Sequence, residues 1–229
     1  MTTLPTVAAF ELATFRHPDP RLGGSRGVVM GFAVQHADGV LLVDTGFGFG
    51  DAELDAFYLI EARRIDEAMR DVGVEREDVV GLLNCHLHVD HAGQNGAFSG
   101  IPTFVQAREW SLRLEPDYTL RPWVDYPGAD IRQIEGDHQL APGIRVLATP
   151  GHTAGHQSLA VDTVDGLVVL AGQACYSVDE WVGAATALEG RSSADDQNDY
   201  DRSIARLRAL GPQRVLFGHD RNAWIAHDR

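Results

Sequence analysis

The chain has 229 residues, 44% of them hydrophobic, and carries a formal net charge of -14 at pH 7. This length favours one domain, residues 1–229, with a sizeable core. The negative net charge argues against a nucleic-acid partner, because binding to a phosphate backbone depends on clustered Lys and Arg. No apolar run approaches the roughly 20 residues that span a membrane, and the N-terminus lacks an export signal, so we expect a cytoplasmic protein without a membrane partner. The two cysteines, Cys85 and Cys175, are then expected to be free thiols.

Short apolar runs bounded by glycine and polar residues predict strands in both halves of the chain. In chain order they cover residues 28–35, 40–43, 79–83, 146–148, 158–161, 167–171 and 214–217. The first two runs flank an Asp38-Gly39 pair, and Asp-Gly between apolar runs is a hairpin signal. We therefore expect a β-hairpin that delivers Asp44 to its end.

Two stretches carry apolar residues at helical spacing. The first covers residues 60–72, with Gly73 placed where a helix stops, and the second precedes the last predicted strand. Their apolar stripes are Ile65, Ala68, Met69 and Val72 in the first, and Tyr200, Ile204, Leu207 and Leu210 in the second. Strand pairs followed by strands that alternate with helices suit an α/β (α+β) fold, a four-layer αββα sandwich of two mixed β-sheets flanked by helices. A doubly wound sheet is the alternative that propensity alone leaves open.

A cluster of histidines and one carboxylate directly follows the third predicted strand, in Asn84-Cys85-His86-Leu87-His88-Val89-Asp90-His91. His86 and His88 have strand spacing and can point the same way, whereas Asp90 and His91 lie in the turn that follows. Imidazole nitrogens and a carboxylate are the donors that Zn²⁺ and similar divalent ions prefer. A lone histidine would indicate an ordinary surface or core residue, but this cluster predicts a metal site.

Two further histidines follow predicted strands later in the chain. His152 lies in Pro150-Gly151-His152-Thr153-Ala154-Gly155-His156, a glycine-rich turn in which the backbone can approach a site closely. His219 follows the last predicted strand, in Phe217-Gly218-His219-Asp220. We expect both to bind metal, and we expect His156 to make structural hydrogen bonds instead.

These segments together resemble the metallo-β-lactamase superfamily, whose signature is His-x-His-x-Asp-His followed by isolated ligands at later strand ends. The resemblance begins at Asp44-Thr45-Gly46 and extends to His219, so it covers most of the chain. It implies that one ion is held by His86, His88 and His152, and another by Asp90, His91 and His219. Asp44 would accept a hydrogen bond from a ligand histidine or, alternatively, cap its own turn. The implied cofactor is Zn²⁺, as one or two ions, with Fe and Mn as alternatives.

Within the superfamily the chain is most similar to N-acyl homoserine lactonases, through residues 40–46, 105–110 and 150–158. The similarity includes Tyr176, whose counterpart in these enzymes binds the substrate carbonyl or the developing oxyanion. Gln173 departs from the pattern, because the lactonases have at this position an aspartate that bridges two ions. An amide oxygen can ligate one ion but brings no negative charge, so we expect the second ion to bind more weakly.

The resemblance implies a metal-dependent hydrolase in which activated water attacks a small-molecule lactone or ester. Tyr176 would stabilise the oxyanion, and Asp90, besides binding metal, would deliver a proton to the leaving oxygen. The loop aromatics Phe47, Phe49 and Trp123 are expected either to line a pocket for an acyl chain or to cover the ends of the sandwich. Alternatives of the same fold are a thioesterase, a mononuclear-metal oxygenase and a catalytically degenerate ligand-binding protein. If the chain associates with itself, a homodimer is the expected state.

Overall fold

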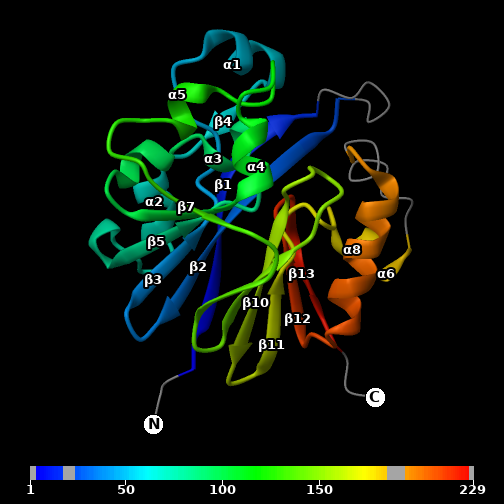
Figure 1. Ribbon diagram of the computed structural model, residues 1–229. Coiled ribbons are helices and arrows are strands. Elements are labelled where there is room, and N and C mark those ends of the chain that lie inside the picture. The colour runs from blue at the N-terminus through cyan, green and yellow to red at the C-terminus, as the bar shows by residue number, and fades with distance from the viewer. Residues whose placement is uncertain (1–3, 18–23, 185–193, 227–229) are drawn as a thin grey trace.

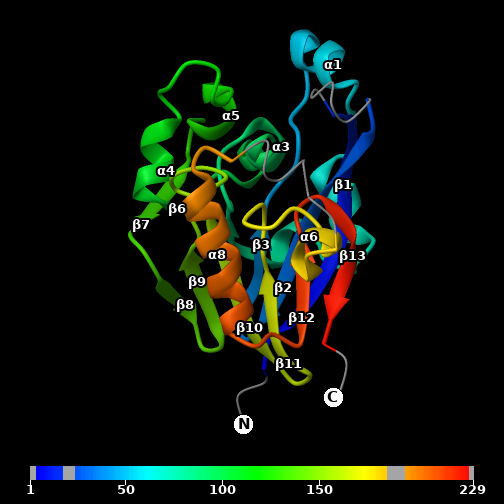
Figure 2. The ribbon, with the colours of Figure 1, turned by 90° about the vertical axis from the view of Figure 1, so that its right-hand side faces the viewer.

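The computed structural model describes residues 4–17, 24–184 and 194–226, in which two sheets pack face to face and helices cover their outer sides (Figures 1 and 2). In spatial order the first sheet consists of Glu61–Ala62 (β4), Thr6–Arg16 (β1), Arg26–His36 (β2), Gly39–Val43 (β3), Val79–Leu83 (β5), Pro102–Gln106 (β6) and Asp130–Ile134 (β7). The second consists of Asp220–Ile225 (β13), Arg214–Phe217 (β12), Gly166–Leu170 (β11), Gln157–Thr163 (β10), Ile144–Ala148 (β9) and His138–Ala141 (β8). The α-helices of the described residues are Ala52–Tyr58 (α1), Ile65–Arg70 (α2), Val89–Ala92 (α3), Ala107–Leu112 (α4), Arg121–Val124 (α5), Val178–Val182 (α6) and Gln197–Ala209 (α8), and 3₁₀ turns cover Arg76–Asp78 and Asn95–Phe98.

Three apolar layers hold this sandwich together. Between the sheets, side chains such as Phe32 of β2 and Leu159 of β10 share one buried cluster. Outside the first sheet Met69 of α2 is buried against β1. The helix α8 lies outside the second sheet (Figure 2), and its Tyr200 and Leu207 are fully buried. Because full burial of one large apolar side chain stabilises the fold by about 1.5–3 kcal/mol, all three layers contribute. The predicted αββα sandwich is confirmed, and the doubly wound alternative is wrong.

The hairpin of β2 and β3 is confirmed, but β6, β7 and β8 were not predicted, and the strand predicted as the last, β12, is followed by β13, which pairs with it. Two further differences have identifiable causes. The pattern of β1 indicated no strand, because a β-bulge between Glu11 and Ala13 interrupts its alternation. The helix predicted over 60–72 is wrong at its start, since Glu61 and Ala62 form β4 beside β1 and the helix covers only Ile65–Arg70. Pairing with β1 gives the backbone of β4 hydrogen-bond partners that the first turn of a helix lacks.

The loops that leave β3, β5, β9, β11 and β12 meet at one end of the sandwich, below α1 in Figure 1. Backbone hydrogen bonds join these loops to strands of the opposite sheet: Gln157 N of β10 donates to Cys85 O at 2.8 Å, and Met30 N of β2 donates to Gly218 O at 2.8 Å. Gly218 N donates in turn to Gly172 O at 2.9 Å. Segments far apart in sequence are therefore fixed side by side.

Two expectations from the sequence concerned membrane-spanning helices and the state of the cysteines. No helix among the described residues is long and apolar enough to cross a membrane. Cys85 and Cys175 are free thiols, as predicted, and the structure buries both. Cys175 lies in the apolar layer under α8, so its side chain packs as a small hydrophobic group.

Candidate metal centre

Three histidines bring their ring nitrogens together beyond the end of β5. His86 Nε2 lies 3.0 Å from His88 Nδ1, and His152 Nε2 lies 3.1 Å from the first and 3.2 Å from the second. His152 arrives on the loop between β9 and β10, which packs tightly on α8. A Cβ on Gly151, whose φ is 142°, would lie 2.4 Å from the backbone of Tyr200. Only glycine fits this approach, which places His152 in the cluster.

These three rings are neutral at neutral pH. Burial is the main cause that lowers the pKa of His88 to about 4. Burial, followed by the neighbouring histidines, lowers the pKa of His86 and His152 well below its usual value. A neutral imidazole keeps a lone pair on one nitrogen, and nitrogens bound tetrahedrally to an ion at about 2.0–2.1 Å stand roughly 3.3 Å apart. The observed spacing therefore fits one shared ion.

A second cluster lies beside the first. Asp90 Oδ2 is 3.3 Å from His91 Nε2 and 3.6 Å from His219 Nε2, and the two histidine nitrogens are 3.3 Å apart. Asp90 and His91 belong to α3, whereas His219 follows β12. The ring centroids of His86 and His91 are 4.1 Å apart, so the clusters are neighbours. The structure thus brings together, as two triangles, the six side chains expected to form two ligand sets.

The second cluster attracts positive charge. Burial alone would lower the pKa of His91, but Cys85, Asp90 and Asp44 raise it well above its usual value. Burial opposes ionisation of Asp90 as well, yet the adjacent histidines, His91 first, hold its pKa far below the usual range. Burial lowers the pKa of His219 to about 4. A metal ion replaces the protons on its ligands when it binds. A buried site where an imidazole and a carboxylate together hold a proton tightly is therefore also favourable for a metal cation.

Fixed acceptors orient the two imidazoles of the second cluster. Asp44 Oδ2 is 2.9 Å from His91 Nδ1, and Asp44 Oδ1 accepts a hydrogen bond from Cys85 N at 2.8 Å. Val28 O lies 2.8 Å from His219 Nδ1. An acceptor at Nδ1 keeps the ring proton there and leaves the Nε2 lone pair free to bind an ion.

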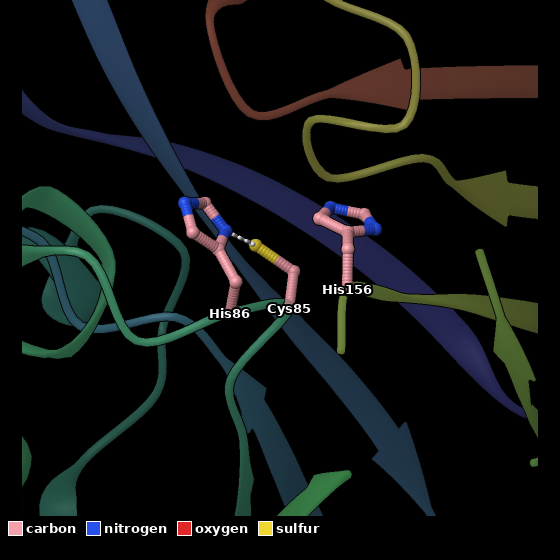
Figure 3. Close-up of side chains that lie close together, drawn as sticks. All are labelled: Cys85, His86 and His156. Atoms are coloured by element: carbon pink, nitrogen blue, oxygen red, sulfur yellow. Dashed lines mark hydrogen bonds between the residues drawn. The ribbon is translucent and has the colours of Figure 1, made fainter. Parts of the chain in front are cut away.

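Two buried side chains, Cys85 and His156, lie beside His86 (Figure 3). The Cys85 thiol points at His86, with Sγ 3.1 Å from Nδ1, and burial raises the pKa of this thiol. His156 Nδ1 lies 2.9 Å from Thr149 Oγ1, and its Nε2 accepts a hydrogen bond from Gln173 N at 2.9 Å. His156 thus makes the structural hydrogen bonds expected of it and holds the backbone of Gln173.

Both clusters open into one cavity of about 200 Å³. Its lining consists of Phe15, His17, Tyr58, His88, Asp90, His152, Gln173, Tyr176 and His219. The ring of Tyr176 stacks on His219, with centroids 4.7 Å apart and planes at 16°. Gln173 Oε1 is buried and has no hydrogen-bond partner within the described part of the chain. A buried carbonyl oxygen without a hydrogen-bond partner is energetically costly. A divalent ion held by the two clusters would give Gln173 Oε1 a partner, so this oxygen also fits a metal centre.

The loop aromatics expected to line an acyl pocket are not among the residues that line this cavity. Phe47 is 1% exposed and packs edge-on against Phe15 in the layer outside the first sheet, so its side chain belongs to the core. Phe49 is 50% exposed, and Trp123 lies against Gly48. The chain folds inward at Phe47 because this ring completes the apolar layer over β1.

Several residues at the site escaped sequence analysis. Phe15 lies on β1 and His17 directly follows it. This strand was not predicted, because a β-bulge interrupts its alternation. Glu109 is 1% exposed and contacts the ligand loops, although glutamate is almost never fully buried unless paired. Its only sequence signal was its place in the lactonase-like stretch 105–110.

Comparison with known sequences agrees with this geometry. The family model described as the metallo-beta-lactamase superfamily matches residues 24–219. An N-acyl homoserine lactonase from Bacillus sp is 32% identical over 205 residues, covering 82% of this chain and 80% of that protein. N-acyl homoserine lactonase AiiA from Bacillus thuringiensis subsp. kurstaki is 30% identical with the same coverage.

Solved structures extend the likeness to three dimensions. An N-acyl homoserine lactone hydrolase with the product N-hexanoyl-L-homoserine at its catalytic metal centre superposes with a TM-score of 0.78 and 27% identity, covering 96% of this chain and 94% of that one. AidC, a dizinc quorum-quenching lactonase, shares the fold with a TM-score of 0.74 at 12% identity, over 100% of this chain and 92% of its own. With its two ligand clusters and a family match that spans most of its length, this chain belongs to the metallo-β-lactamase superfamily.

Proposed function

We propose that the protein is a metal-dependent hydrolase that opens the ring of N-acyl homoserine lactones. The observation that carries this proposal is the pair of ligand clusters lying side by side at one cavity, with Tyr176 in the same wall. Relatives at 30–32% identity are N-acyl homoserine lactonases, and one similar structure holds the product of lactone opening at its metal centre. These findings support a small-molecule lactone as substrate.

Zinc is the metal that we propose. The residues that would hold it are His86, His88 and His152 in one set and Asp90, His91 and His219 in the other, with Gln173 Oε1 beside them. Nitrogen and oxygen donors suit zinc, and iron or manganese accepts the same donors, so elemental analysis of the purified protein decides the identity. When bound, such an ion lowers the pKa of a coordinated water and so supplies a nucleophile at neutral pH.

Two side chains act directly on the reacting groups. The Tyr176 hydroxyl donates a hydrogen bond to the carbonyl oxygen of the substrate as negative charge develops there. Asp90 accepts the proton that the attacking water loses and returns it to the ring oxygen as the carbon–oxygen bond breaks. The products are the open-chain acid and its alcohol, so atoms and protons balance.

Histidine variants test the proposal. His88→Ala and His152→Ala each remove one corner of the first triangle, so both should lose bound metal and hydrolysis of N-hexanoyl homoserine lactone. His138→Ala is the matched control, because His138 is exposed on β8. A metal-free variant with full lactonase activity would overturn the proposal.

The same measurements separate the alternatives. One iron per chain with no lactone hydrolysis would favour the mononuclear oxygenase, whereas hydrolysis of thioesters alone would favour the thioesterase. Stoichiometric metal without any turnover of lactone or phenyl ester would favour the degenerate ligand-binding protein.

We also propose a cytoplasmic location and a homodimer. The two free, buried thiols support the location, because reducing compartments keep cysteines unpaired. Sedimentation of the purified protein tests the dimer.

A further inference from the structure

The buried carboxylate of Glu109 belongs to neither ligand cluster. Glu109 lies in α4, directly after β6, and is 1% exposed. Its Oε1 accepts a hydrogen bond from Leu87 N at 2.8 Å, and its Oε2 accepts one from Thr153 Oγ1 at 2.7 Å. The Tyr118 hydroxyl also donates to Oε1, and the backbone N–H of Gly155 also hydrogen-bonds to the carboxylate. This side chain therefore receives hydrogen bonds from four separate groups.

These contacts join the two loops that supply the first cluster. Leu87 stands between His86 and His88, and Thr153 directly follows His152. One carboxylate thus connects the backbone between two ligand histidines to the residue beside the third.

The packing around Glu109 reinforces this connection. The ring of Tyr118, which donates to Glu109, lies 4.8 Å from the ring of His88. A Cβ on Gly155 would lie 2.2 Å from Glu109 N, so the loop of His152 closes directly onto the start of α4. The positions of His88 and His152 therefore depend on contacts with α4.

The chemistry at this point calls for a carboxylate. All four groups around Glu109 donate, and a carboxylate offers two oxygens with about four lone-pair sites, whereas an amide offers one oxygen and two further donors. Burial raises the pKa of Glu109, and the hydrogen bonds from Tyr118, Thr153 and the backbone oppose that rise. Glutamine at this position would keep the shape but would set an NH₂ group against donors.

The second cluster is anchored by other residues. His91 is held at Nδ1 by Asp44, and its backbone oxygen accepts a hydrogen bond from Asn84 Nδ2 at 3.1 Å. His219 is held by Val28 O. None of the hydrogen bonds that Glu109 makes in the described residues reaches these groups.

We propose that Glu109 is a positioning residue that sets the spacing of His86, His88 and His152, and thereby the affinity of that half of the centre for a divalent ion. The proposal rests on the metal-dependent function proposed above and assigns to the three-histidine half a support that the other half does not use. Substitution of Glu109 should weaken the three-histidine half and leave the half formed by Asp90, His91 and His219 unchanged.

The test is Glu109→Gln, with cobalt(II) as the probe ion. Affinity is measured by competition with a chromogenic chelator, and ligand geometry by the visible absorption of the bound cobalt. One of the two ions should bind about 10- to 100-fold more weakly, the range seen when groups that orient metal ligands are replaced, and its absorption bands should shift. In a His219→Ala background, which disables the other half, the same loss should appear for the ion that remains.

Glu180→Gln is the matched control. Glu180 is also a buried carboxylate, 5% exposed, but its Oε2 accepts hydrogen bonds from Tyr176 N at 2.7 Å and Tyr200 Oη at 2.8 Å, neither of which lies in the loops of His86, His88 and His152. Glu180→Gln should lower the unfolding temperature without changing the cobalt affinity or the absorption bands of the three-histidine half. If Glu109→Gln does not fold, Thr153→Val removes one of the four donors and should give a smaller loss in the same direction.

The outcomes distinguish this inference from the proposed function. Wild-type affinity and spectrum in folded Glu109→Gln would overturn it, as would equal weakening by Glu180→Gln. If the wild-type protein itself binds no divalent ion, the proposed function fails first. Tight metal binding without lactonase activity would refute the proposed substrate while leaving the role of Glu109 intact.

Discussion

Replacing Asp44 with asparagine tests the electrostatics of the second cluster directly. Both carboxylate oxygens of Asp44 face donors: Oδ1 accepts from Cys85 N at 2.8 Å, and Oδ2 lies 2.9 Å from Cys85 Sγ and 2.9 Å from His91 Nδ1. In Asp44→Asn the amide NH₂ must meet a donor whichever way it turns. If it faces His91, the ring proton moves to Nε2, the nitrogen that points at Asp90 and His219, and the lone pair for an ion is lost.

The size of the effect follows from these contacts. Asp44 and His91 are both fully buried, and a hydrogen bond to a charged group contributes about 1.5–3 kcal/mol. At about 1.4 kcal/mol per tenfold change in affinity, this corresponds to an ion bound roughly 10- to 140-fold more weakly. Replacing a carboxylate that orients a ligand histidine costs about 10–100-fold in other metal sites. We therefore expect a loss of about two orders of magnitude or less, larger for the ion at the second cluster than for the ion at the first.

The backbone does not confound this experiment. Asp44 has a φ of 60°, in the left-handed region, which asparagine adopts more readily than most residues. Zinc affinity and stoichiometry are measured by chelator competition, with Asp38→Asn as the control, because the Asp38 side chain is 85% exposed on the hairpin. If Asp44→Asn binds both ions as tightly as the wild type, or loses both equally, the assigned role of Asp44 is refuted.

The remaining predictions concern the cavity and pH. Gln173→Asp should tighten the weaker ion by adding a negative charge beside both clusters, and unchanged zinc stoichiometry and affinity would contradict this. Tyr176→Phe should lower kcat for N-hexanoyl homoserine lactone by about 10²–10³, as loss of an oxyanion donor does, with metal content unchanged; equal kcat would exclude the hydroxyl from catalysis. Burial lowers the pKa of His88 and His219 to about 4 and of His156 to about 3 from an ordinary value of 6.5, so the unfolded chain binds more protons between these values. The stability that these three histidines contribute to the metal-free protein should therefore be fully present above pH 6.5 and be lost as the pH falls towards 4; urea midpoints that do not decline from pH 6.5 to pH 4 would contradict it.

Much of this protein follows from short-range patterns. The hairpin of β2 and β3, the strand β5 and the helix α8 were predictable, because periodicity and turn residues act over a few positions. The residues that we propose as metal ligands could be identified for the same reason. His86, His88, Asp90 and His91 are concentrated in one segment, and their side chains have few other uses together.

The error in the predicted helix arose where a distant segment decided the outcome, because Glu61 and Ala62 pair with β1 instead of starting the helix. The burial of Phe47 likewise depends on the apolar layer over β1. Local propensity is weak compared with such pairing and burial. The sequence specifies which side chains are present, but local patterns do not show which distant side chains come into contact.

The sequence by itself determined which chemical groups are present, namely the histidines, the carboxylate and Gln173 in place of the lactonases' aspartate. It also determined the order of the elements that carry them. The tertiary structure alone decided that Asp44 faces His91 and that Glu109 joins the loops of His86 and His152. Those contacts link segments far apart in the chain, and they form because buried polar groups need partners wherever the packed sheets place them.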